Sequence, residues 1–84
     1  MRSDRDLAIR LAQELFKEKQ AQGMDMSHGP CLAEEIIPDW CVDVGHSPRQ
    51  DVDNLPQNQC QSWLSGRVHH FVELDPEGNV IRAP

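Results

Sequence analysis

The segment that decides the fold is VHHFVELDPEGNVIR, residues 68–82. Apolar side chains recur in it with a period of two as far as Leu74, which is the pattern of a β-strand. Residues 75–79 then hold a proline that presets φ and a glycine that accepts a positive φ, as a turn requires. Residues 80–82 are placed to return antiparallel. The sequence therefore predicts a β-hairpin within residues 67–84.

An amphipathic helix is predicted for residues 1–22. Leucine and alanine recur at helical spacing from Leu7 to Phe16, and the charged side chains fall mostly on the opposite face. Ser3 is in the position of an N-cap, and Gly23 supplies a left-handed stop at the C-terminal end. The apolar stripe is expected to pack on the chain's own core, and homodimerisation through the same stripe is the alternative.

The middle of the chain, residues 23–54, is predicted to be rich in loops because prolines and glycines interrupt it. Pro30 suits the first position of a short helical turn over residues 31–37. Residues 40–44 have the composition of a short strand.

A second helix is predicted for residues 55–66, opened at Pro56 and closed by Gly66, with Cys60 and Trp63 on one face. Together these elements predict one α+β domain over residues 1–84. Both helices are expected to pack on one face of a small antiparallel sheet of about three strands.

Charge and composition narrow the classes of function. The chain has 84 residues and a net charge of −6, and residues 23–66 hold seven acidic side chains against one basic, Arg49. This segment therefore argues against nucleic acid as a partner, because such binding relies on clustered Lys and Arg. A cation or a basic protein partner suits it better, and the alternative is that the acids only keep the protein soluble.

The start of the chain and its cysteines indicate a compartment. The first residues are charged and lead into the helical pattern, so no secretory signal is predicted, and no stretch is long enough to span a membrane. We therefore expect a cytoplasmic protein with reduced thiols. A disulfide framework is not expected from three cysteines in that setting.

Four side chains predict a zinc site, since two sulfur and two nitrogen donors fall within residues 28–46: His28, Cys31, Cys41 and His46. This is the chemistry of tetrahedral zinc, and a core this small often needs a staple. Cys60 and His70 are possible substitutes for one of the four ligands. The alternative is that the cysteines are small buried hydrophobes and the histidines lie at the surface.

A thiol site is the other interpretation of the same residues. Cys31 follows Gly-Pro at a predicted helix start, where backbone N–H groups favour a thiolate. His28–Cys31 resembles the Cys-Gly-Pro-Cys loop of thioredoxins over four residues, with histidine in place of the attacking cysteine, so neither fold nor activity carries over. Cys60 with His70, oriented by an acid such as Asp43, is a second thiol site.

The function favoured by the sequence is that of a small non-enzymatic binding protein with a structural zinc and an acidic surface for a partner. The alternative is a thiol-dependent enzyme or redox protein that uses Cys31 or Cys60. The acidic run of residues 51–54 lacks the glycine and the distant glutamate of a calcium loop, so it is expected to be a solvated turn.

Overall fold

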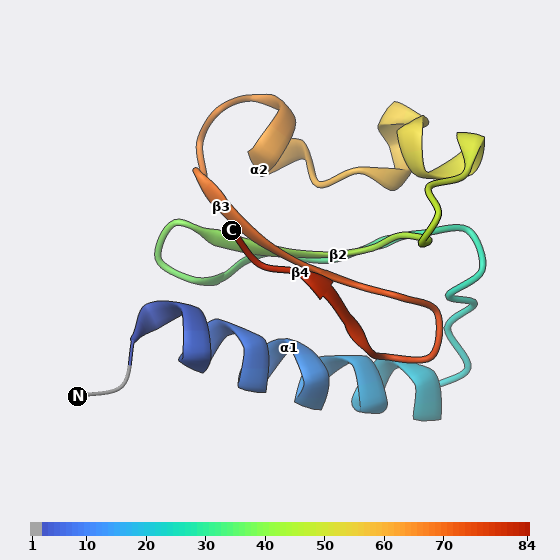
Figure 1. The fold of residues 1–84 in the computed structure, drawn as a ribbon, viewed down its shortest axis with the longest axis horizontal. Helices are drawn as coiled ribbons and strands as arrows, with labels where there is room; N and C mark the ends of the chain where they lie inside the picture. Colours follow the sequence, from blue (N-terminus) through green and yellow to red (C-terminus); the bar gives the residue numbers. More distant parts are fainter. Residues whose placement is uncertain (1–2) are drawn as a thin grey trace.

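The computed structural model describes residues 3–84 as a four-stranded sheet with a layer of chain on each face (Figure 1). The α+β class predicted from the sequence is confirmed. The helices and strands are, in chain order, α1 (Asp4–Ala21), β1 (Cys31–Ile37), β2 (Trp40–Val44), α2 (Gln61–Leu64), β3 (His70–Leu74) and β4 (Val80–Arg82), with two 3₁₀ turns, η1 (Asp51–Asn54) and η2 (Pro56–Asn58), between β2 and α2.

Helix α1 forms as its sequence predicts. The Ser3 hydroxyl accepts a hydrogen bond from the backbone N–H of Asp6 at 3.1 Å, which satisfies one of the free donors of the first turn. Beyond its other end Gly23 has a φ of +88°, which L side chains rarely adopt. The buried residues Ala8, Ala12 and Phe16 recur every four positions, so one stripe of the helix faces the sheet.

The sheet is mixed, whereas the sequence predicted a small antiparallel one. Its strand order is β1-β2-β3-β4, with antiparallel hairpins on both sides and parallel pairing between β2 and β3 in the centre. The predicted hairpin of β3 and β4 is confirmed, with Glu73 opposite Arg82. A fourth strand is present because β1 joins at the edge, and the parallel register runs from Trp40 beside His70 to Val44 beside Leu74.

Residues 31–37 form strand β1, so the predicted helical turn is wrong. Cys31 lies opposite Asp43 and Ile37 opposite Trp40. The proline at position 30 also suits the start of a strand, and the β-branched pair Ile36 and Ile37 favours extended backbone. The strand predicted at residues 40–44 is confirmed as β2.

The predicted helix over residues 55–66 is also wrong in length. Only the four residues of α2 are α-helical, although Gly66 ends the turn with a φ of +77° as expected. Parallel strands need a long connection, and residues 45–69, here called the crossover segment, must span the sheet from the end of β2 to the start of β3. Cys60 and Ser62 are buried there, whereas Trp63 is 42% exposed.

The two layers lie on opposite faces of the sheet, in contrast to the expectation that both helices share one face. Figure 1 shows α1 beneath the sheet and the crossover segment with α2 above it. The main core lies between α1 and the sheet, and its buried residues are Ala8, Ala12, Phe16, Met26, Leu32, Trp40, Val42, Val44, Val72, Leu74 and Ala83. A smaller buried cluster on the other face consists of Cys41, Cys60 and Val68.

A disulfide between Cys31 and Cys60 joins β1 to the crossover segment, so the expectation of reduced thiols is wrong for this pair. Cys41 is free and buried. The bridged cysteines are 29 positions apart, and closing a loop of that length stabilises a domain by about 3–4 kcal/mol in the chain-entropy account. The bond is therefore a covalent link between β1 and the crossover segment, outside the main core.

The position of the core on the α1 side predicts that two leucines contribute very differently to the free energy of unfolding. Leu74 is fully buried, whereas Leu64 is 48% exposed. We expect Leu74→Ala to lower the free energy of unfolding by about 2–5 kcal/mol, because it removes buried methyl groups and leaves a cavity. Leu64→Ala, the matched control, should change it by less than about 0.5 kcal/mol. Urea unfolding of the oxidised protein measures both, and equal effects would contradict this placement of the core.

Candidate ligand pocket between the sheet and the crossover segment

The face of the sheet that α1 does not cover is polar. Side chains alternate along a strand, so residues two apart share a face. Because β2 and β3 are parallel and in register, Cys41 lies beside Phe71, and Asp43 lies beside Glu73. Arg82 of β4 pairs with Glu73 from the next strand. One face of three neighbouring strands therefore gathers an acid pair, a guanidinium and an aromatic ring.

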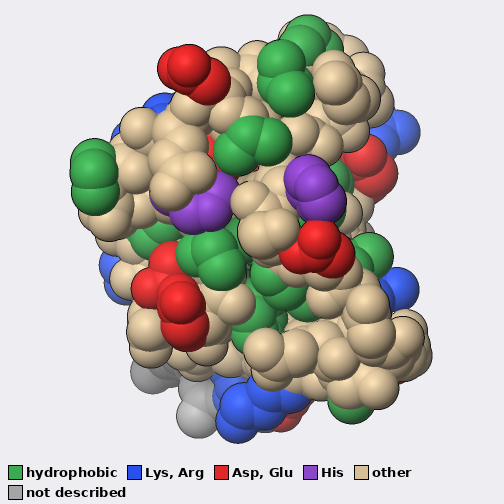
Figure 2. Space-filling model, turned by 90° about the vertical axis from the view of Figure 1, so that its right-hand side faces the viewer, with side chains coloured by type: hydrophobic (Ala, Val, Ile, Leu, Met, Phe, Trp, Pro, Cys, Tyr) green, Lys and Arg blue, Asp and Glu red, His purple; other side chains and the backbone are tan. Residues whose placement is uncertain are grey.

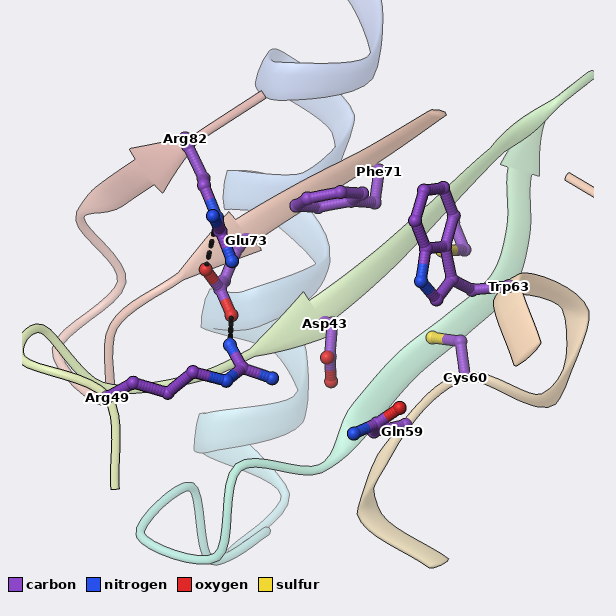
Figure 3. A pocket seen from close by; sticks show the side chains of 9 residues that line it. Asp43, Arg49, Gln59, Cys60, Trp63, Phe71, Glu73 and Arg82 are labelled. Atoms are coloured by element: carbon purple, nitrogen blue, oxygen red, sulfur yellow. Dashed lines mark hydrogen bonds and ion pairs between the residues drawn. The ribbon is translucent and has the colours of Figure 1, made fainter. Parts of the chain in front are cut away.

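A pocket of about 270 Å³ lies between these strands and the crossover segment. Figure 3 shows Asp43 near its centre, with Arg49 and Glu73 on one side and Trp63 on the other. It is lined by Cys41, Asp43, Arg49, Gln59, Cys60, Trp63, Phe71, Glu73 and Arg82. This volume is slightly below the usual range for drug-sized ligands, about 300–1,000 Å³, so the pocket suits a small molecule with about one ring.

Glu73 is a buried carboxylate held by two arginines that reach it from opposite directions (Figure 3). Arg49 Nη1 and Arg82 Nε each donate to a different oxygen of Glu73, both at 2.9 Å. The Glu73 side chain is 5% exposed, against 37% for Arg49 and 56% for Arg82. Gly45 leaves room for this carboxylate, because a Cβ there would clash with the Glu73 side chain.

Arg49 is fixed by further bonds, whereas Arg82 is not. Arg49 also donates from Nε to Asn54 Oδ1 at 2.8 Å and from Nη2 to the Asp53 carbonyl at 3.2 Å. Within residues 3–84, the hydrogen bond of the Arg82 side chain is the one from Nε, so its two terminal amino groups have no protein acceptor there. The end of Arg82 is thus available to an incoming acceptor.

Two aromatic rings form the other side of the pocket. Trp63 of α2 meets Phe71 edge to face with 4.9 Å between ring centroids. The Arg82 guanidinium lies 5.4 Å from the Phe71 centroid, within cation–π range. Trp63 is 42% exposed, so much of its ring is open to a ligand. The pocket therefore combines a flat apolar wall with a cationic end.

The surroundings of Asp43 favour the protonated form of its carboxyl. Burial raises the pKa of its carboxyl to about 8, and the negative charges of Glu73 and, more weakly, Asp53 act in the same direction. The backbone N–H of Val44 donates to Asp43 Oδ1 at 3.0 Å, and this bond and the charge of Arg49 only partly oppose the shift. A protonated carboxyl can donate a hydrogen bond through its O–H.

The charge of the pocket follows from these states. Arg49 and Arg82 bring two positive charges, ionised Glu73 brings one negative charge, and protonated Asp43 brings none. Asp53, which holds Arg49 through its carbonyl, adds a second negative charge nearby, so the positive charge that a ligand can reach is the terminal end of the Arg82 guanidinium. A local excess of one sign in a sheltered cleft favours ligands of the opposite sign.

His46 and Asp53 form a buried pair that braces this side of the pocket. Asp53 is 2% exposed, so the expectation of a solvated turn at residues 51–54 is wrong for this residue. Its carboxylate receives the His46 backbone N–H at 2.9 Å and lies 2.8 Å from His46 Nδ1. Burial raises the pKa of Asp53, but hydrogen bonds from Gln50 and His46 outweigh burial and leave it lowered. Through its carbonyl, Asp53 also holds Arg49.

The structure does not gather the four predicted zinc ligands. Cys31 is bonded to Cys60, Cys41 is buried and free, His46 pairs with Asp53, and His28 lies 3.2 Å from Asp25 at the surface. Figure 2, which shows the side of the molecule that lies on the right in Figure 1, has histidine side chains at separate places. Among residues 3–84, a group with ligand atoms within 4.8 Å of one another is Cys31, Glu34 and Cys60. Zinc binding stays a prediction, and through this group it would require reduction of the disulfide.

The structure does not bring the residues of either predicted thiol site together as a thiol and a base. Cys31 and Cys60 form one bond instead of providing two separate nucleophiles. His70 stacks on Trp40 with 4.7 Å between ring centroids, and its strand alternation puts it on the α1 face, away from Cys60. Burial, with a further contribution from the charge of Asp43, raises the pKa of the Cys41 thiol to about 11. Cys41 therefore stays protonated and is a poor partner for thiol–disulfide exchange.

The residues of the pocket were mostly missed by sequence reasoning. The period-two pattern of β3 could have shown that Phe71 and Glu73 share a face opposite Val72. For Glu73, the sequence signal that could have been used is a charged residue in the middle of an apolar strand. Nothing local in the sequence connects Arg49 to it across 24 positions.

Comparison with family models, with curated proteins and with solved structures finds no match to this chain. Among the described residues, no helix is long and apolar enough to cross a membrane. The proposed function therefore rests on the geometry of the pocket.

The protonated state of Asp43 predicts how stability changes with pH. In the unfolded chain this carboxyl ionises at about pH 3.9, but in the folded protein it keeps its proton to about pH 8. The contribution of Asp43 to the free energy of unfolding is therefore complete below about pH 4 and is lost as the pH rises toward about 8. An amide in place of this carboxyl would not titrate.

We expect Asp43→Asn to gain stability relative to the parent protein as the pH rises from about 4 to about 7. The expected gain is on the order of 1–2 kcal/mol after allowance for partial exposure. Urea unfolding at both pH values measures it. Asp51→Asn at an exposed position is the control and should show little change with pH. A flat difference for Asp43→Asn would show that Asp43 is ionised in the folded protein.

Proposed function

We propose that the protein binds a small organic anion with a flat apolar part in the pocket between the sheet and the crossover segment. The observation that carries the proposal is the arrangement around Glu73: two guanidiniums hold one buried carboxylate, and the terminal end of Arg82, with no protein acceptor among residues 3–84, lines a pocket with an aromatic wall. This keeps the binding function expected from the sequence and replaces the cation-binding acidic segment with an anion-binding cleft.

Arg82 is the group that would meet the anionic end of the ligand. Its terminal amino groups have no acceptor among residues 3–84, and its Nε bond to Glu73 fixes the orientation of the guanidinium plane. A guanidinium held in this way offers paired donors to a carboxylate or phosphate, and such charged hydrogen bonds are stronger than neutral ones. Arg49 supports the site electrostatically, because each of its three guanidinium nitrogens already donates one hydrogen bond to the protein.

The rest of the ligand would lie between Asp43 and the aromatic wall. Trp63 and Phe71 provide ring faces and edges for a flat apolar group. The protonated Asp43 donates a hydrogen bond to an acceptor on the ligand, and above about pH 8 its negative charge would repel the same ligand. Binding should therefore weaken as Asp43 ionises.

Two probes separate the anionic groups that fit this chemistry: benzoate carries a carboxylate and phenyl phosphate carries a phosphate. We expect at least one to bind with a Kd on the order of 1 mM, as suits so few atoms, and to shift the indole NMR signal of Trp63. Benzyl alcohol, which has the ring without the charge, should bind at least about tenfold more weakly, since a charged hydrogen bond contributes about 1.5–3 kcal/mol.

Variants then test the assigned residues. Arg82→Gln should raise the Kd of the anionic probe about tenfold or more. Arg67→Gln removes the same charge from an exposed position outside the pocket and should leave the Kd nearly unchanged. Trp63→Ala removes the wall without emptying the core, and should also weaken binding. Benzyl alcohol binding as tightly as both anions, or equal Kd values for the two arginine variants, would contradict the proposal.

A further inference from the structure

The wall of the pocket that carries Gln59, Cys60 and Trp63 belongs to the crossover segment and not to the sheet. This wall has two attachments to β1. One is the Cys31–Cys60 disulfide, and the other is a set of hydrogen bonds between Glu34 and the start of α2. Trp63 also packs edge to face on Phe71 of β3, but the disulfide holds the middle of the crossover segment on the sheet by a covalent bond.

The second attachment is noncovalent and joins exposed Glu34 to buried Ser62. Glu34 is exposed, and its carboxylate accepts from the backbone N–H of Ser62 at 2.8 Å and of Gln61 at 3.3 Å. Its carbonyl accepts from the Ser62 hydroxyl at 2.6 Å. A single hydrogen bond makes only a modest net contribution to stability, less than that of the disulfide. Helix α2 has only four residues and cannot hold its shape alone.

We propose that the Cys31–Cys60 disulfide gates the pocket: the oxidised form holds the Gln59–Trp63 wall on the sheet, and reduction by a dithiol releases that wall and weakens ligand binding. The second part rests on the proposed function, whereas release of the wall does not. The proposal develops the thiol alternative inferred from the sequence, with Cys31 and Cys60 as a regulatory pair.

The chemistry is ordinary thiol–disulfide exchange. A thiolate of the dithiol attacks Cys31 Sγ, the more accessible sulfur, since Cys31 is half-buried and Cys60 is 1% exposed. The S–S bond breaks, and Cys60 leaves as a thiolate and takes up a proton. The second thiol of the reagent then displaces Cys31 from the mixed disulfide. Two cysteine thiols and one oxidised, cyclic reagent result, with two electrons transferred.

Cys41 does not interfere with this exchange in the folded protein. It lies in the same buried cluster as Cys60, but its thiol stays protonated for the reasons given above. The main core on the α1 face contains neither bridged cysteine, so the sheet and α1 keep their packing when the bond opens. The expected change is therefore local to the crossover segment.

Hydrogen exchange followed by mass spectrometry tests release of the wall. Wild type is compared oxidised, reduced with dithiothreitol and reoxidised with oxidised glutathione, and Cys31→Ala/Cys60→Ala serves as a permanently open variant. We expect exchange over residues 59–66 to become at least about tenfold faster on reduction and to recover on reoxidation, while residues 6–20 of α1 stay protected. Dithiothreitol should not change the variant.

Titration with benzoate and phenyl phosphate in the same four samples tests the gate itself. If the closed wall is populated only about a tenth of the time after reduction, the Kd of the probe that binds should rise about tenfold. Unchanged exchange over residues 59–66, equal Kd values for oxidised and reduced protein, or loss of protection in α1 as well would each overturn the gate. If the wall is released but the oxidised protein binds neither probe, the proposed function fails instead, and the ligand gate fails with it.

Discussion

The parallel pairing of β2 and β3 is the feature from which the layers and the pocket follow. Two parallel neighbours cannot be joined by a tight turn, so the 45–69 connection has to cross one face of the sheet. Helix α1 covers the other face, and the protein becomes a three-layer molecule of only 84 residues (Figure 1). The crossover segment buries only a small cluster of Cys41, Cys60 and Val68 on this face, and the pocket lies beside that cluster.

Burying charged and polar side chains on this face of the sheet costs free energy of folding, and this cost suggests that the residues serve a function. Burying Glu73 is tolerated because both of its oxygens receive guanidinium donors, yet buried ion pairs rarely stabilise a fold more than apolar residues would. Asp43 is placed beside Glu73 and responds by keeping its proton. Two neighbouring acids in different protonation states, with an arginine free at one end, are better suited to recognition than to stability.

The sequence predicts what depends on local signals and misses what depends on distant partners. The Ser3 cap, the Gly23 stop and the 75–79 turn are local, and α1 and the β3–β4 hairpin were predicted from them. Strand β1 was missed because its extended form is set by pairing with β2, which outweighs the helix-start signal of Pro30. The site was missed because Arg49 reaches Glu73 only after the crossover is in place, although Arg82 meets Glu73 within the predicted hairpin.

The disulfide was misjudged for a related reason: three cysteines and a charged N-terminal segment indicated reduced thiols, but pairing depends on which cysteines the fold brings together. Peptide mapping of the native, unreduced protein by mass spectrometry, after alkylation of free thiols, tests this placement of the crossover segment most directly. We expect a Cys31–Cys60 linkage, with Cys41 unmodified until the protein unfolds. A linkage that includes Cys41, or alkylation of Cys31 and Cys60 in the oxidised protein, would contradict the way the crossover segment lies on the sheet.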